Sequence, residues 1–147
     1  MQYFFAKIFN KETIMFKIIR TIGAVTRTIQ IDSNNHFKEL GLNNNLFIYI
    51  IRTCEQPGMF LGELADNVQI DRTTAFRTIK KLVKLGYFDL KNDSINQKIK
   101  RVYPTQKAMD IYPQLHEYEQ QQSDFLLSNL STEEIAQLEK LMTKLKY

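Results

Sequence analysis

One stretch constrains the fold of this chain more than any other: residues 70–86, which read I-D-R-T-T-A-F-R-T-I-K-K-L-V-K-L-G. Asp71 is a good N-cap, because its carboxylate can accept hydrogen bonds from the free amides of a first helical turn. Gly86 stands where a helix can end in a left-handed cap. On a helical wheel, the apolar side is formed by Ala75, Ile79 and Leu82. The stretch therefore predicts an amphipathic helix with one buried face.

The opposite side of this predicted helix is polar and basic. It carries Thr73, Arg77, Lys80 and Lys84, flanked by Arg72, Thr74 and Lys81. Hydroxyls and a guanidinium near the start of a helix can reach base edges in the DNA major groove, while lysines further along meet phosphates. The alternative is the solvated basic face of an ordinary surface helix. The sequence that follows favours the first interpretation.

The charge of the chain is concentrated in and after this helix. Residues 71–101 contain nine Lys and Arg against three Asp and Glu, a net of +6 in a chain whose net charge is +4. Residues 1–70 are nearly balanced at +1, and residues 102–147 carry −3. Positive charge collected in one segment is typical of a surface that binds a polyanion.

The residues before the basic helix complete a supersecondary arrangement. Pro57-Gly58 marks a turn, and a short helix is expected over about residues 60–67. Its inward side is expected to hold Leu61, Leu64 and Ala65. Residues 68–70 form a tight connection to the basic helix. Two short helices joined by a turn, the second of them basic, are the helix-turn-helix arrangement.

After Gly86 the hydrophobic period changes to that of strands. Residues 87–90 and 98–103 are rich in aromatic and β-branched residues, and residues 91–97 between them are polar. We expect a β-hairpin whose second strand brings in Lys98 and Lys100. A hairpin directly after a helix-turn-helix is a wing, and its basic strand can lie along the DNA backbone. The alternative is a hairpin that merely seals the core.

Helices are predicted on both sides of this lobe. One covers about residues 12–40, and a second, apolar nearly all round, covers about 46–56 and belongs in the core. Thr105 can cap a long helix that runs to about residue 129, which Pro113 should kink or shift. Residues 131–134 form a capping box for a last amphipathic helix.

The outer helices have little of the compact lobe left to pack on. We therefore expect the first long helix and the last two to form a dimer interface. Residues 1–11 are rich in aromatic side chains, whose exposure would be unfavourable. This segment is either a frayed tail or an arm that packs Phe4, Phe5, Ile8 and Phe9 on a partner, and the cost of exposure favours the arm.

Residues 62–87, G-E-L-A-D-N-V-Q-I-D-R-T-T-A-F-R-T-I-K-K-L-V-K-L-G-Y, resemble the helix-turn-helix of MarR-type transcriptional regulators. The hairpin, Thr105 and the order of helices extend the likeness over about residues 15–147. The resemblance implies a homodimer in which each subunit places one recognition helix in a major groove. It also implies that Thr73, Thr74 and Arg77 contact bases and phosphates. Many such proteins respond to small aromatic or anionic ligands, so an effector of this class is a candidate partner.

The chain departs from the family pattern in three places, the wing motif, Phe60 and Phe76. The wing commonly carries Asp-x-Arg, whose arginine enters the minor groove, whereas this chain reads Asn96-Gln97-Lys98. Because lysine is more strongly hydrated than guanidinium and suits a narrow minor groove less well, we expect weaker or less selective wing contacts. Phe60 stands where the family tends to have Ser or Thr, so the following helix lacks a side-chain cap. Phe76 stands where the family more often has a small or polar residue; it can contact a thymine methyl, but packing on the flank with Val83 is favoured.

The sequence contains no set of residues typical of a metal site, a phosphate-binding loop or an enzyme active site. His36 and His116 are far apart and Cys54 has no nearby residue of ligand type, so no metal site is predicted. The five glycines are scattered and form no phosphate-binding loop. We expect no enzyme activity and no cofactor. The lone cysteine fits a reducing cytoplasm, and neither a membrane span nor a signal peptide is predicted.

The sequence thus predicts a mainly α fold with a small β-hairpin wing, in which a winged helix-turn-helix core is flanked by N- and C-terminal dimerisation helices. A single domain over residues 1–147 would hold the dimerisation helices at about 12–40 and 105–147 and the DNA-binding lobe at about 46–104. The predicted function is a cytoplasmic, homodimeric repressor that reads a pseudo-palindromic operator in double-stranded DNA. The alternative is a winged-helix module for protein contacts with weak affinity for DNA, which steep salt dependence of DNA binding would argue against.

Overall fold

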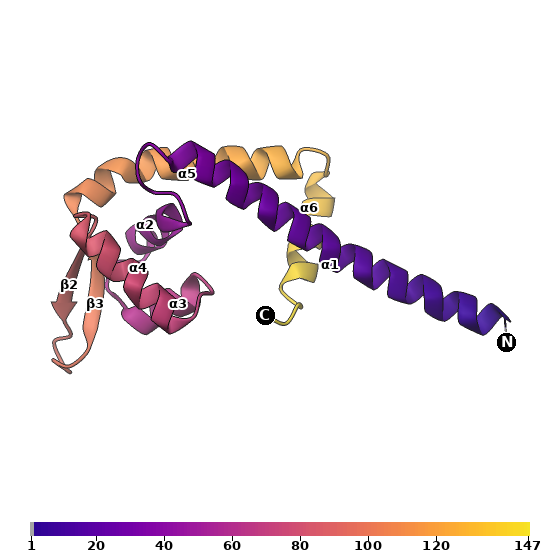
Figure 1. The fold of residues 1–147 in the computed structure, drawn as a ribbon, viewed down its shortest axis with the longest axis horizontal. Helices are drawn as coiled ribbons and strands as arrows, with labels where there is room; N and C mark the ends of the chain where they lie inside the picture. The colour runs from indigo at the N-terminus through magenta and orange to yellow at the C-terminus, as the bar shows by residue number, and fades with distance from the viewer. Residues whose placement is uncertain (1) are drawn as a thin grey trace. The chain divides into compact units, whose positions relative to one another are not determined.

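The structure is a computed structural model, which describes the backbone of residues 2–147 and the side chains of residues 13–147. Figure 1 shows a mainly helical chain with one small antiparallel sheet, as the sequence predicted. By its internal contacts the chain divides into an N-terminal unit, residues 1–49, and a C-terminal unit, residues 50–147. The two units are described in turn.

The N-terminal unit consists mainly of α1, Gln2–Phe37. The predicted range of 12–40 is wrong at both ends, because residues 2–11 contain no proline or glycine to stop a helix and the chain leaves the helix before Gly41. Gly41 adopts a φ of +68°, and the amide of Leu42 donates to the Phe37 carbonyl at 3.1 Å. The prediction for the side chains of residues 1–11 lies outside the described side chains.

Helix α2, Leu46–Glu55, begins in the N-terminal unit and ends in the C-terminal unit. Its predicted central place is confirmed, since its buried side chains are Leu46, Phe47, Tyr49, Ile50, Ile51 and Thr53. In the N-terminal unit the rings of Phe37 and Phe47 have centroids 4.6 Å apart. The polar break before α2 places Asn44 and Asn45 in the left-handed region, with φ of 55° and 63°. Asparagine tolerates this conformation better than most residues, which explains its repetition there.

The C-terminal unit contains the helix-turn-helix, formed by α3, Leu61–Asn67, and α4, Arg72–Lys84. The connection turns at Gln69, whose φ is 56°, and the Ile70 amide donates to the Ala65 carbonyl at 3.1 Å. The inward face predicted for α4 is confirmed, because Ala75, Ile79 and Leu82 are all fully buried. In α3, Leu64 and Ala65 are buried and Leu61 is half-buried.

The sheet has three strands, in the order β1-β3-β2, all antiparallel. The predicted hairpin corresponds to β2, Phe88–Asn92, and β3, Lys100–Pro104. Strand β1, Met59–Phe60, was not predicted, because two residues show no hydrophobic period. It pairs with Val102 and Arg101 of β3 and leads directly into α3. The wing is thus joined to the helix-turn-helix through a strand as well as through the chain.

The last two helices are α5, Gln106–Leu127, and α6, Thr132–Met142. Thr105 caps α5 as predicted, and its hydroxyl also donates to the Gly86 carbonyl at 2.7 Å. Pro113 does not shift the start of α5 and lies inside the helix. The capping box of α6 is confirmed: the Glu134 amide donates to Ser131 Oγ and the Ser131 amide donates to Glu134 Oε2. The described part of α6 buries no side chain.

Candidate nucleic-acid interface

Helix α4 is held at its start by the cap that the sequence predicted. The backbone amide of Thr74 donates to Asp71 Oδ1 at 2.9 Å. That hydrogen bond is the main reason why the pKa of the Asp71 carboxyl is lowered, so the charged cap persists to a lower pH than an ordinary aspartate would allow. With its apolar side buried in the C-terminal unit, α4 has its first turn set by Asp71 and its opposite face turned to solvent.

Every predicted contact residue on α4 is exposed. These are Arg72, Thr73, Thr74, Arg77, Lys80, Lys81 and Lys84. An ion pair links Arg72 to Asp66 at 3.4 Å, with about two thirds of each side chain exposed, at 68% and 66%. An exposed pair of this kind contributes little and leaves the guanidinium accessible. The structure therefore presents hydroxyls and cations together on one open helix face, as DNA contact requires.

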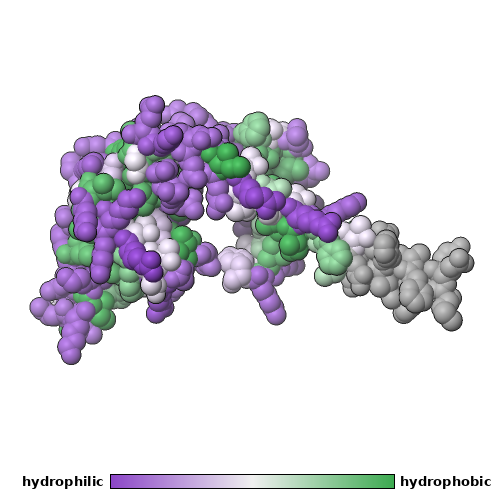
Figure 2. Space-filling view, in the orientation of Figure 1, coloured by the Kyte–Doolittle hydropathy of each residue, from purple (hydrophilic) through white to green (hydrophobic). Residues whose placement is uncertain are grey.

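The wing presents the other two predicted cations. Lys98 lies in the loop between β2 and β3, Lys100 begins β3, and both side chains are exposed. At the position where the family has an aspartate, Asn96 accepts a hydrogen bond from the Lys98 amide at 3.2 Å. Asn96 thus shapes the loop and leaves the Lys98 side chain to solvent. At the end of the hairpin that Figure 1 labels β2 and β3, Figure 2 shows mainly hydrophilic side chains with some hydrophobic ones beside them, and the loop there exposes Ile95 and Ile99 as well.

The observed strands begin and end at other residues than the predicted ranges 87–90 and 98–103, because the side chain of Asp93 closes the loop between them. Both the Ile95 and the Asn96 amides donate to Asp93 Oδ2, at 3.2 and 2.9 Å. The turn therefore begins at Asp93, and regular pairing starts with Asn92 opposite Lys100. A side-chain hydrogen bond within a turn leaves no periodic signal in the sequence.

Arg101 was predicted only as part of the basic segment over residues 71–101, with no individual role. Its Nε donates to Asp93 Oδ1 at 2.6 Å, and its Nη1 donates to the Gly58 carbonyl at 2.7 Å. The guanidinium carbon also lies 3.9 Å from the centroid of the Phe60 ring. Gly58 and Phe60 are far from Arg101 in sequence, so no local spacing could have identified them, and the contact with Asp93 depends on the exact turn of the hairpin. The Asp–Arg pairing that appeared lost from the wing is present here between other residues.

Phe60 gives α3 no side-chain cap, as expected. The structure supplies half of a capping box instead, because the Phe60 amide donates to Glu63 Oε2 at 2.7 Å. Phe76 is half-buried, in keeping with a place on the flank of α4.

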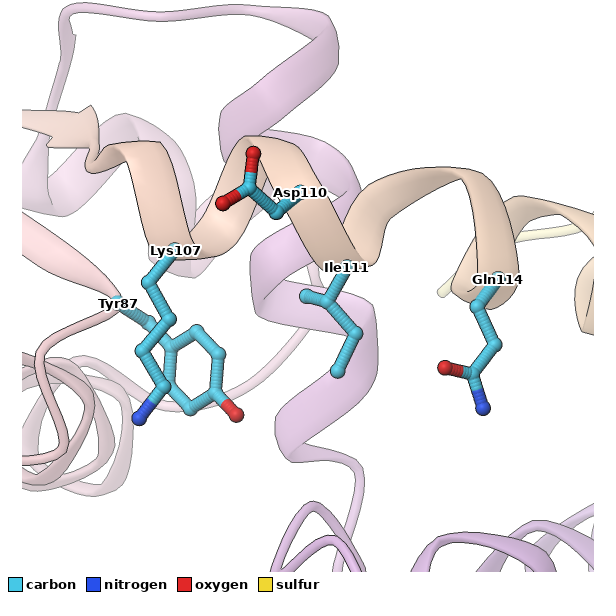
Figure 3. A pocket seen from close by; sticks show the side chains of 5 residues that line it. All are labelled: Tyr87, Lys107, Asp110, Ile111 and Gln114. Carbon is cyan, nitrogen blue, oxygen red and sulfur yellow. The ribbon is translucent and has the colours of Figure 1, made fainter.

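A hollow of about 380 Å³ in the C-terminal unit is lined by Tyr87 together with four residues of α5. Those four are Lys107, Asp110, Ile111 and Gln114. Figure 3 shows the Lys107 side chain running beside the Tyr87 ring, and its ammonium nitrogen lies 4.3 Å from the ring centroid. The same ammonium donates to the Leu85 carbonyl at 2.8 Å. Lys107 therefore already has partners that hold the start of α5 against the end of α4.

Cys54 does not have the environment of a reactive thiol. It is half-buried on α2, and desolvation, with a smaller contribution from Glu55, raises the pKa of the Cys54 thiol to about 11. The thiol is protonated at neutral pH, whereas oxidation and metal binding require the thiolate. In the part of the chain with described side chains, no three ligand-type residues gather as a metal site would need. No helix there has the length and apolar character to cross a bilayer.

Comparison with known proteins places the chain among regulators. It is 35% identical over 132 residues to the HTH-type transcriptional regulator YybA of Bacillus subtilis, covering 90% of this chain and 88% of that protein. It superposes on the transcriptional regulator SlyA with a TM-score of 0.83 and 38% identity, over 86% of this chain and 89% of the other. A comparison with models of protein families found no match.

A MarR family regulator from Listeria monocytogenes, solved in complex with a 26mer DNA, has a TM-score of 0.82 and 36% identity. The superposition covers 86% of this chain and 84% of that one. These relatives are regulators and not enzymes, in agreement with the sequence-based prediction. The exposed basic helix, the wing and these likenesses lead to one conclusion: the chain belongs to the MarR family of winged helix-turn-helix transcriptional regulators.

Proposed function

We propose that this regulator is a homodimeric repressor that reads a pseudo-palindromic operator in double-stranded DNA. The observation that carries the proposal is the open face of α4, where two hydroxyls, two guanidiniums and three ammonium groups are exposed together. A helix of this composition fits the major groove, whose base edges distinguish all four base pairs. The Listeria relative solved with DNA supports the same partner for this chain.

The proposed contacts divide by chemistry. Arg77 reads base edges, since a guanidinium can pair with guanine in a bidentate way, and Thr73 and Thr74 lie one turn earlier. The cations Arg72, Lys80, Lys81 and Lys84 neutralise phosphates, as do Lys98 and Lys100 from the wing, on the backbone or in the minor groove. The net of +6 over residues 71–101 supplies the general attraction to DNA.

The homodimer is proposed from apolar side chains that remain exposed within each unit. In the N-terminal unit, α1 exposes Ile14, Met15, Phe16, Ile18, Ile19, Val25 and Ile31. In the C-terminal unit, α6 and its end expose Ile135, Leu138, Leu141, Met142 and Leu145. Apolar surface of this extent marks an interaction site in a folded protein. We propose that it is covered in the dimer, so that the dimerisation helices at about 12–40 and 105–147 and the lobe at 46–104 act as one cytoplasmic MarR-like domain.

Two further points belong to the proposal. A small aromatic or anionic effector follows from the family alone and is supported by no residue set of this chain. The competing function is a winged-helix module for protein contacts, favoured only by the missing wing arginine at Lys98. The exposed cations of α4 argue against that function, because an apolar protein interface has no need of them.

The test is binding of the purified protein to its own upstream DNA and to a scrambled duplex of equal length, at two salt concentrations. The molecular mass in solution is measured in parallel. We expect a dimer that prefers its own DNA and whose affinity falls steeply as salt rises, because bound phosphates release counterions. Lys144→Ala, at an exposed site beyond α6, serves as a charge-matched control for Lys80→Ala on α4. Equal binding of both duplexes would remove the operator-reading function.

A further inference from the structure

Arg101 is a cation of the wing whose side chain forms hydrogen bonds and a stacking contact with other protein groups. Its guanidinium donates to Asp93 and to the Gly58 carbonyl and stacks on Phe60, and one third of the side chain, 33%, remains exposed. Lys98 and Lys100 on the same hairpin are exposed. Two of the five N–H donors of this guanidinium and one of its faces are occupied, so less of it is available to a phosphate than of the exposed ammonium groups of Lys98 and Lys100.

Asp93 connects Arg101 to the loop at the tip of the wing. Its side chain is only 8% exposed, and while Oδ1 accepts from Arg101, Oδ2 accepts from the Ile95 and Asn96 amides. The Asp93 amide in turn donates to the Ile99 carbonyl at 2.9 Å. The loop that carries Lys98 is therefore closed on one carboxylate, which Arg101 holds in place.

The other end of this connection is the start of the helix-turn-helix. Gly58 and Phe60 flank Met59 at β1, which pairs with β3 over only two residues before the chain enters α3. The Gly58 amide also donates to the Val102 carbonyl at 2.8 Å. So short a strand provides little rigidity by itself. The bidentate and stacked Arg101 adds three contacts between β3, the loop of the wing and the approach to α3.

We propose that Arg101, through Asp93, is a positioning residue that sets the wing at a fixed angle to the helix-turn-helix, so that Lys98 meets DNA while α4 occupies the major groove. The proposal rests on the proposed function. In this proposal Asp93 favours DNA binding by positioning the loop, although its negative charge alone would repel phosphate. The two effects change DNA affinity in opposite directions, so a variant without the charge can distinguish them.

The first test compares two acidic residues of the wing. Asp93→Asn and Asp89→Asn each remove one negative charge, and Asp89 is an exposed residue of the neighbouring strand β2. If charge alone mattered, both variants would bind the operator more tightly. We expect Asp89→Asn to bind as tightly as the wild type or more so, and Asp93→Asn to bind roughly tenfold more weakly with a reduced salt slope, because Lys98 is no longer held at the backbone. Tighter binding by Asp93→Asn would overturn the proposal.

The second test keeps the charge of Arg101 and removes its geometry. Arg101→Lys retains a cation but cannot bridge Asp93 and Gly58 in the plane of a guanidinium. We expect it to weaken operator binding about as much as Arg101→Gln, again roughly tenfold. We also expect the double variant with Asp93→Asn to bind no worse than either single variant, since all three break one connection. Wild-type affinity in Arg101→Lys would show that Arg101 acts only as a charge.

Amide hydrogen exchange in the free protein supplies a readout that needs no DNA. Exchange at Ile95 and Asn96 should accelerate in Arg101→Gln and stay unchanged in Lys100→Gln, which removes a cation from the adjacent position of β3. Slow exchange retained in Arg101→Gln would contradict the proposed route to the loop. If the wild type itself failed to prefer operator DNA, the proposed function would be wrong. If the wild type preferred operator DNA and Asp93→Asn bound it more tightly, only the proposed role of Arg101 would be wrong.

Discussion

The basic helix and the wing present cations in different ways. On α4 the presentation is local: a cap at Asp71 sets the first turn, buried Ile79 and Leu82 hold one side, and the helical period turns the other side to solvent. On the wing, Lys98 sits in a loop that has no such period. Its place depends on Asp93 and on Arg101, which in turn depends on Gly58 and Phe60.

From this difference we expect α4 and the wing to contribute differently to DNA binding. Helix α4 is anchored by the buried side chains of Ala75, Ile79 and Leu82, so we expect its exposed side chains to be held in place well enough to be selective. The strands of the wing are anchored by buried Phe88 and Val102, whereas the loop that carries Lys98 is closed mainly by Asp93, so a single substitution can change the position of that loop. The predictions below separate these two kinds of support, beginning with the largest expected effect.

The first prediction concerns the buried side of α4. Leu82→Ala should lower the free energy of unfolding by about 2–5 kcal/mol, because it leaves a cavity beneath the helix. Leu82 is fully buried, whereas Leu85, at the end of the same helix, is 39% exposed. Leu85→Ala is therefore the matched control and should cost much less. Urea denaturation of both variants measures the difference, and equal losses would mean that α4 is not anchored by this face.

The second prediction concerns the exposed side of α4. Arg77→Ala should weaken operator binding by about 1–3 kcal/mol and relax specificity at one base pair. The melting temperature should hardly change, since Arg77 is exposed. Binding titrations against a set of operator variants provide the measurement. Unchanged affinity and specificity would show that another part of the molecule reads the sequence.

The third prediction concerns the tip of the wing. Lys98→Ala should weaken binding to all sequences alike and reduce the slope of log K against log salt by about one, as expected for one lost phosphate contact. Lys98→Arg restores the guanidinium that the family commonly has at this position. It should bind more tightly at sites with a narrow minor groove. A change of specificity comparable to that of Arg77→Ala would break the proposed contrast between helix and wing.

The fourth prediction concerns the pH dependence of the wing. The hydrogen bond from Arg101, and then the Asn96 amide, lower the pKa of the Asp93 carboxyl below its unfolded value. Its contribution to stability is therefore complete above the unfolded pKa of about 3.9 and is lost as the pH falls through the folded pKa. The melting temperature of Asp93→Asn should lie below that of the wild type at pH 7. The gap should begin to narrow as the pH falls below about 4 and should close once the pH lies below the folded pKa.

Calorimetry at the two pH values tests this, with Asp89→Asn as the control. Asp89 is exposed on β2, so its variant should melt close to the wild type at both. A gap for Asp93→Asn that stays constant with pH would show that the ionised pair with Arg101 is not its source.

Much of the candidate interface could be predicted from sequence because it follows from local rules. The apolar spacing of Ala75, Ile79 and Leu82, the cap at Asp71 and the turn at Gly86 all act within one helix. The capping box at Ser131 is local in the same sense and was also confirmed. The early start of α1 at Gln2 was missed, because the predicted boundary relied on a periodic pattern and the segment had no stop signal to decide it.

The features that could not be predicted from the sequence, strand β1 and the contacts of Arg101, depend on residues that are distant along the chain. Strand β1 exists because β3 offers Arg101 and Val102 as partners, and two residues cannot signal a strand on their own. The half-buried Arg101 is indistinguishable in sequence from the exposed lysines around it. Its distance from Gly58 along the chain hides the contact.

The sequence by itself determined that this chain is a mainly helical MarR-type regulator with a basic helix, because helical period, capping and charge distribution are properties of neighbouring residues. Only the tertiary structure decided which wing cation faces solvent and which holds the wing, because hydrogen bonding to Asp93 and Gly58 and stacking on Phe60 require the fold to bring them together.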